Sequence, residues 1–167
     1  MAVLHPARSA DRFDPADCRY MADFARAHLF VYARSLGTVL RVDGEVDASN
    51  ARDLTATIHR FGRLMTPLVL DLSRLRSISV EGFRALLLLN DELRKSRVHC
   101  CVVPGAAIRA LLRLVHDNRL ALADSVPEAF QNIKDIVRAR REFLSDLARP
   151  APMRAAVRRP DRGALKR

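Results

Sequence analysis

Apolar side chains recur along this chain at two spacings, every second residue as in a strand and every third or fourth as in a helix. Segments with the two spacings alternate along the chain. Residues 28–34 form a strand-like segment that could extend back to residue 22, and inward and outward positions alternate in residues 38–44. A tight turn separates the two segments, which predicts a hairpin. Three further strands are expected, at residues 66–72, 98–103 and 120–125. The first of these is an uninterrupted apolar run, typical of a central strand buried on both faces, and the last is a short edge strand.

Four other segments repeat apolar residues at helical spacing. These helices are expected at residues 50–63, 82–96, 106–118 and 126–148, with Ser49 or Asn50 capping the first and Ser79 suited to cap the second. Helices therefore alternate with all strands after the hairpin. This order predicts an α/β fold with a mixed β-sheet of four to five strands and helices packed on it.

Composition narrows the class of protein. The chain has 167 residues, of which 49% are hydrophobic and none is Trp, so one domain with an aliphatic core is expected. Three cysteines cannot all pair with one another, which favours a reducing compartment. No apolar stretch approaches the length of a membrane span, and the first residues lack a secretory signal pattern. The expected location is therefore cytoplasmic.

The two ends of the chain differ from the middle. Residues 1–21 are mostly polar with two prolines and are expected to form a flexible arm, whereas residues 22–148 should form the folded domain. Residues 149–167 contain seven basic residues and one acidic residue, so +6 of the net charge of +10 lies there. Such a composition predicts a disordered tail that is dispensable for folding.

Catalytic motifs are scarce. The sequence contains no glycine-rich phosphate loop, no dinucleotide-binding fingerprint and no G-x-S-x-G nucleophile motif. His99, Cys100 and Cys101 are consecutive in a predicted strand and cannot converge on one metal ion. The acids around Gly44 (Asp43, Glu45 and Asp47) are more typical of a solvated loop than of a metal site. We therefore expect no enzyme activity, no cofactor and no metal.

The start of the second predicted helix carries an acid. Ser79 occupies the expected cap position and Glu81 lies in the first turn, where unpaired backbone N–H groups stabilise a carboxylate. The residues alone favour a simple capped helix. A functional alternative is an anionic surface presented to a partner.

Four stretches in order resemble the STAS family, which includes bacterial anti-sigma-factor antagonists and the C-terminal domains of sulfate transporters. They are TVLRVDGEVDASNARDL, TPLVLDLSRLRSIS, SVEGFRALLLLNDELRKS and VHCCVVPGAAIRALLRLVHDNRLALADSVPEAF, and together they span about residues 22–133. The resemblance implies the STAS fold and a non-enzymatic role in bacterial transcription regulation.

The family's antagonists carry a D-S-S-G signature at the start of this helix, and a kinase-type anti-sigma factor phosphorylates the serine immediately before its glycine and thereby breaks the complex. Here Glu81 precedes Gly82, while Ser79 and Val80 stand at the preceding two signature positions. No phosphorylation is expected at Glu81, and Ser79 is a nearby hydroxyl that does not match the acceptor position. The resemblance implies docking to an anti-sigma factor or related regulator through residues 77–94. The implied partner-binding residues are Glu45, Asp47, Ser77, Ser79, Val80, Glu81, Gly82 and Phe83.

Two other functions are compatible with the same sequence. A STAS adaptor subunit of an ABC-type transport ATPase would use the same surface. Alternatively, the Arg-rich tail could make electrostatic, sequence-independent contacts with nucleic acid. The first alternative predicts co-purification with an ATPase subunit, and the second predicts binding that weakens steeply with salt.

Overall fold

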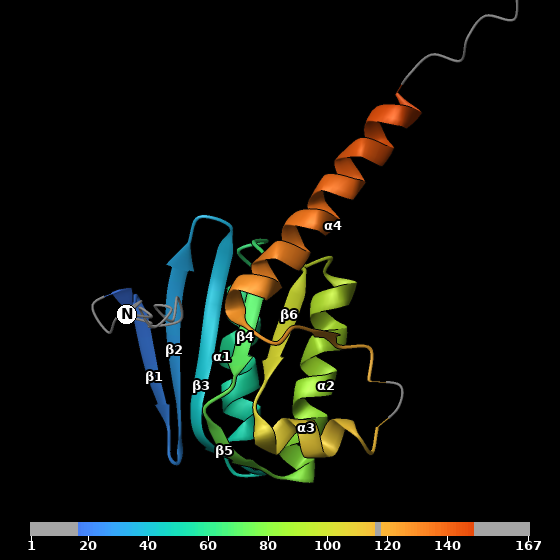
Figure 1. Cartoon of the computed structure of the whole chain (residues 1–167). Helices are drawn as coiled ribbons and strands as arrows, with labels where there is room; N and C mark the ends of the chain where they lie inside the picture. The colour runs from blue at the N-terminus through green and yellow to red at the C-terminus, as the bar shows by residue number, and fades with distance from the viewer. Residues whose placement is uncertain (1–16, 116–117, 149–167) are drawn as a thin grey trace, which may run out of the picture.

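In the computed structural model, which describes residues 17–115 and 118–148, one mixed sheet has helices on both of its faces (Figure 1). The described residues form seven strands and four helices. In chain order they are β1 (Tyr20–Phe24), β2 (Ala27–Arg34), β3 (Gly37–Val46), α1 (Ala51–Gly62), β4 (Leu68–Leu72), β5 (Leu75–Ile78), α2 (Val80–Lys95), β6 (Cys100–Pro104), α3 (Ala106–Leu112), β7 (Ala121–Leu122) and α4 (Val126–Leu147).

The sheet combines antiparallel and parallel pairing. Its order is β1-β2-β3-β4-β6-β7, and β5 pairs with the end of β3. The strands β1, β2 and β3 are antiparallel, whereas β3, β4, β6 and β7 run parallel. The predicted α/β fold with a mixed sheet is therefore confirmed, including the central position of β4, all five residues of which are buried.

Strand alternation sends apolar side chains to two separate cores. On one face, Leu29, Leu40 and Val42 pack with Leu54 of α1 and Leu89 of α2. The other face carries a smaller cluster that includes residues of β2, β3, β4 and β6 and the first turns of α4: Tyr32, Val39, Val69, Cys101, Val103, Val126, Ala129 and Ile133. Figure 1 shows α1 and α2 side by side behind the sheet and α4 crossing in front of it.

The helix α4 begins with a cap and ends beyond the sheet. The Ser125 hydroxyl accepts a hydrogen bond from the Glu128 backbone N–H at 3.3 Å, and Pro127 lies in the first turn, where proline is favoured. Only its N-terminal part is packed on the sheet, and its C-terminal part projects away from the rest of the fold (Figure 1). Among the described residues, no helix combines the length and apolar character needed to cross a membrane.

The strand count differs from the expected four to five because two strands were not anticipated. The segment before residue 28 is a separate strand, β1, since Ala25 turns the chain with a positive φ of 52°. Its start at Tyr20 places the last two residues of the expected arm inside the sheet. The second unanticipated strand, β5, is short and half-exposed, so it lacks a clear apolar pattern.

Two helix boundaries also differ from the expectation. The helix α3 ends at Leu112, well before the expected residue 118, and α2 starts at Val80, two residues before Gly82. The short strand β7 is at the edge of the sheet, as predicted. The expected basic tail at residues 149–167 and most of the expected N-terminal arm lie outside the described residues.

Candidate functional site

Ser79 fixes the junction between β5 and α2. Its backbone is extended, with φ −76° and ψ 167°, and its hydroxyl accepts a hydrogen bond from the Gly82 N–H at 3.1 Å. Its own N–H donates to the Val46 carbonyl at 2.9 Å, which ties the start of the helix to the end of β3. Ser79 is therefore the helix cap that the sequence predicted.

Gly82 allows α2 to approach β3 closely. It is buried, and a Cβ at this position would lie 2.9 Å from Val46 Cγ1 and 3.1 Å from the Val46 carbonyl oxygen. These distances are shorter than ordinary van der Waals contacts, so a larger residue would displace the helix start. The glycine thus sets the position of the neighbouring Glu81.

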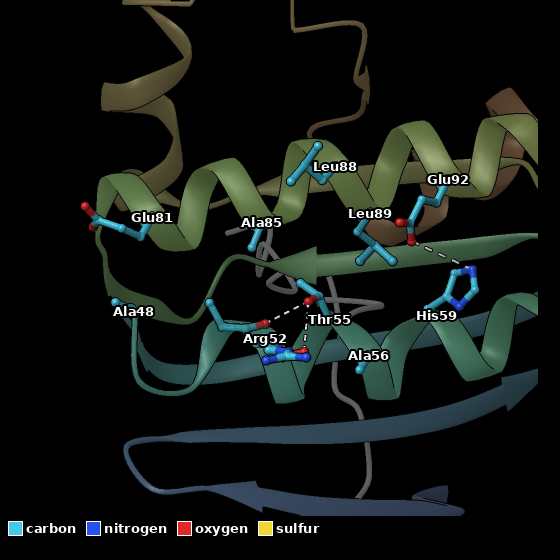
Figure 2. A pocket seen from close by; sticks show the side chains of 11 residues that line it. Ala48, Arg52, Thr55, Ala56, His59, Glu81, Ala85, Leu88, Leu89 and Glu92 are labelled. Carbon is cyan, nitrogen blue, oxygen red and sulfur yellow. Dashed lines mark hydrogen bonds and ion pairs between the residues drawn. The ribbon is translucent and has the colours of Figure 1, made fainter.

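Glu81 is exposed in the first turn of α2 and points outward from the helix end (Figure 2). A hydrogen bond to its own backbone N–H, followed by one from the Ser79 hydroxyl, holds the pKa of this carboxyl below its usual value. The nearby Arg84 guanidinium acts in the same direction. Glu81 therefore carries a fixed negative charge at neutral pH.

Glu45 and Asp47 flank this helix start but are engaged within the fold. Arg26 forms ion pairs with Glu45 and, at 3.8 Å, with Asp47. The Asp47 carboxylate also accepts hydrogen bonds from the Ser49 hydroxyl at 2.5 Å and the Ser49 N–H at 2.8 Å, and these bonds lower its pKa. Their main visible role is to hold the loop between β3 and α1.

The remaining implied contact residues divide into exposed and buried ones. Ser77 is exposed on β5 opposite Glu45 in the strand pairing, and Val80 is 53% exposed. Phe83, in contrast, is only 4% exposed and packs in the core with α1 and the sheet. Ser77, Val80 and Glu81 are therefore exposed around the start of α2, whereas Gly82 and Phe83 are buried.

A groove between α1 and α2, which the sequence patterns do not predict, adjoins Glu81. It has a volume of about 490 Å³, and its lining includes the small side chains of Ala48, Ala51, Ala56 and Ala85. Glu81 lies at one end of the groove and the His59–Glu92 pair, 3.9 Å apart, lies at the other (Figure 2). Leu88 is 66% exposed along it. The alanines of α1 and α2 do not predict this groove by themselves, because it forms only where the two helices pack together.

Cys100 and Cys101 are neighbours at the start of β6. Burial raises the pKa of the Cys100 thiol to about 12, and burial also raises the pKa of Cys101. Both thiols are therefore protonated at neutral pH and are poor nucleophiles and metal ligands. Within residues 17–115 and 118–148, no three His, Cys, Asp or Glu side chains are grouped so that they could hold a metal ion.

One family model and several known proteins match this chain. The STAS domain model matches residues 31–134. Osmosensory protein A of Mycobacterium tuberculosis is 29% identical over 130 residues, which are 75% of this chain and 82% of that protein. An anti-sigma factor antagonist from Mycobacterium paratuberculosis superposes with a TM-score of 0.58 and 25% identity, covering 65% of this chain and 94% of that structure.

The fold also resembles that of the anti-sigma factor antagonist SpoIIAA in its unphosphorylated form. The TM-score is 0.51 at 17% identity, and the match covers 64% of this chain and 96% of SpoIIAA. At this level of identity the likeness concerns the fold alone.

Proposed function

Because the chain belongs to the STAS domain family, we propose that it is a regulatory binding protein of the anti-sigma-factor-antagonist type, acting by docking and not by catalysis. Its proposed partner is an anti-sigma factor or a related regulator. The solved structure from Mycobacterium paratuberculosis is described as such an antagonist, and the match covers 94% of it.

The observation that carries this proposal is the exposed carboxylate of Glu81 at the start of α2, next to an open groove. In family antagonists, the position before this glycine holds the serine whose phosphorylation breaks the complex. A glutamate carries about one negative charge and cannot be dephosphorylated, whereas phosphoserine carries roughly −1.5 to −2. Regulation at this position is therefore proposed to be fixed, not switched by phosphorylation.

The proposed contact surface consists of Ser77, Val80 and Glu81 and the adjoining α1–α2 groove. Val80 and Leu88 supply exposed apolar area, and Glu81 supplies a charge that a basic group of the partner can reach. Gly82 and Phe83 support this surface from below. Glu45 and Asp47 hold the neighbouring loop through their bonds to Arg26 and Ser49.

The test starts from the partner captured with the full chain from the native cell and identified by mass spectrometry. The purified partner is then titrated with the wild type, Glu81→Ala and Glu81→Ser. If a basic pocket receives the carboxylate, Glu81→Ala should weaken binding roughly tenfold, as for loss of a charge-assisted hydrogen bond. If Glu81 instead imitates the phosphorylated state, Glu81→Ser should bind more tightly and become a substrate for a kinase-type partner.

The matched control is Glu142→Ala, an exposed glutamate on α4 outside this surface. It should leave affinity unchanged. Equal affinities for the wild type and both Glu81 variants would mean that the α2 start is not the interface, and the proposed docking surface would then be wrong.

A further inference from the structure

The apolar face of α4 continues beyond the part of the helix that the sheet covers. Val126, Ala129 and Ile133 are buried against the sheet. Successive residues turn by about 100° around a helix, so the later apolar residues extend the same stripe. These later residues are instead exposed: Ile136 is 46%, Phe143 63%, Leu144 54% and Leu147 67% exposed.

The exposed part of this face (Ile136, Phe143, Leu144 and Leu147) forms a bare stripe. It lies beyond the residues that the family model matches. The family match ends at residue 134, and the stripe occupies residues 136–147. Figure 1 shows the C-terminal end of α4 projecting away from the sheet, so an extended surface could approach it without meeting the rest of the fold. Three of the large apolar side chains, Phe143, Leu144 and Leu147, are grouped in these last turns.

Charges are distributed unevenly around the same turns. Arg140 lies within the stripe and Arg141 lies beside it, at about 60° from Leu144 on a helical projection. Glu142 lies at about 160° from Leu144, on the opposite side, where its carboxylate accepts a hydrogen bond from Arg138 at 3.0 Å. Two basic residues therefore adjoin the apolar stripe, while Glu142 faces away from it and a second acid, Asp146, lies at about 60° from Phe143.

The chain that follows the helix adds to the positive charge. Residues 149–167 contain seven basic residues and one acidic residue. A complementary occupant must be both anionic and apolar. A second copy of this chain would bring two such basic segments together, and a nucleic acid offers no apolar layer for Phe143, Leu144 and Leu147.

We propose that the C-terminal end of α4 binds an anionic lipid bilayer surface, to which the net positive charge of residues 149–167 also attracts the chain. The apolar side chains enter the boundary between headgroups and acyl chains, and the arginines pair with the anionic headgroups. Apolar burial and basic charge are the two contributions that stable peripheral attachment requires. The start of α2 lies at the other end of the molecule in Figure 1, so the lipid-bound chain would still present it.

The absence of Trp from the chain makes this proposal directly testable. In Leu144→Trp, the single indole reports on the stripe. Its emission should shift to the blue when the full chain meets vesicles of phosphatidylcholine and phosphatidylglycerol mixed two to one, and not with phosphatidylcholine alone. The control Leu114→Trp, at a position 76% exposed outside α4, should show no shift with either vesicle.

Vesicle co-sedimentation measures the affinity. The double variant Phe143→Ser/Leu144→Ser should bind the mixed vesicles at least about tenfold more weakly, since two large apolar side chains are lost, whereas Leu114→Ser should bind like the wild type. No binding of the wild type to the mixed vesicles would overturn the proposal, and so would equal binding by the double variant. A concentration-dependent dimer in sedimentation velocity that the double variant abolishes would assign the stripe to a second copy instead.

Discussion

Ser79 both caps α2 and stabilises the charge of Glu81 at the proposed docking surface. Its hydroxyl accepts from the Gly82 N–H and also donates to the Glu81 carboxylate, whose pKa it lowers. We expect Ser79→Ala to lower the free energy of unfolding by about 1 kcal/mol, the usual cost of losing a helix cap. It should also move the pKa of Glu81 back toward its usual value. Urea unfolding and NMR titration measure the two effects.

The lowered pKa of Glu81 also predicts how the stability of the fold changes with pH. Because the pKa of Glu81 is lower in the folded state, its contribution to stability is present above the unfolded pKa and is lost as pH falls through the folded pKa. Wild type and Glu81→Gln should therefore converge in stability in acid and separate at neutral pH. Ser77→Ala, at an exposed position of β5, is the control for the loss of a serine hydroxyl and should alter neither the stability nor the pKa of Glu81.

Gly82 shows why a glycine is needed at this helix start even though alanine is the better helix former. The 2.9 Å approach of a Cβ to Val46 Cγ1 would force β3 and α2 apart. Gly82→Ala is expected to destabilise the fold by about 1–3 kcal/mol, the range for overpacking, in spite of its gain in helix propensity. Urea unfolding of the wild type, of Gly82→Ala and of the exposed control Arg84→Ala measures this loss of stability. A more stable Gly82→Ala would contradict the close contact.

At the scale of elements, the loop between β3 and α1 depends on Asn50. Asn50, one of the two predicted caps, occupies the N-cap position of α1, but its side chain forms no cap hydrogen bond to the helix. The buried Asn50 amide instead accepts from the Asp47 N–H at 2.9 Å and donates to the carbonyls of Glu45 at 2.9 Å and Phe24 at 3.2 Å. It therefore ties the loop to the ends of β1 and β3.

Removing this amide should cost more than removing a cap. Asn50→Ala leaves buried backbone groups without partners, and we expect a loss of about 2–3 kcal/mol in thermal or chemical unfolding. Ser49→Ala, a neighbouring exposed position, should cost much less. Similar losses for the two variants would show that the Asn50 bonds contribute little.

The sequence predicts those strands and helices that carry a local pattern of their own. The buried run of β4 and the amphipathic pattern of α4 carry strong local signals, and both elements were predicted. Local signals failed for β5, which is stabilised by pairing with β3 and not by its own composition, and for the turn at Ala25, which contains no glycine, proline or asparagine. The α1–α2 groove depends on tertiary packing, so it could not be read from either helix alone.

At the scale of the whole molecule, the family core and its C-terminal extension have separate proposed roles. The family match covers residues 31–134, and the proposed docking surface lies within it. The bare stripe of α4 and the basic segment lie outside it. Changes in the extension should therefore leave the core and its partner binding intact.

Removal of residues 149–167 tests this separation. The described helix ends at Leu147, and the segment has a composition that cannot bury enough apolar surface to offset its ordering entropy. A chain ending at residue 148 should therefore keep the Tm of the full chain and the affinity for the protein partner. Its binding to anionic vesicles should weaken, and the remaining binding should depend less on salt because fewer charges contribute. A large fall in Tm would show that residues 149–167 pack on the domain, which would contradict the proposed boundary at residue 148.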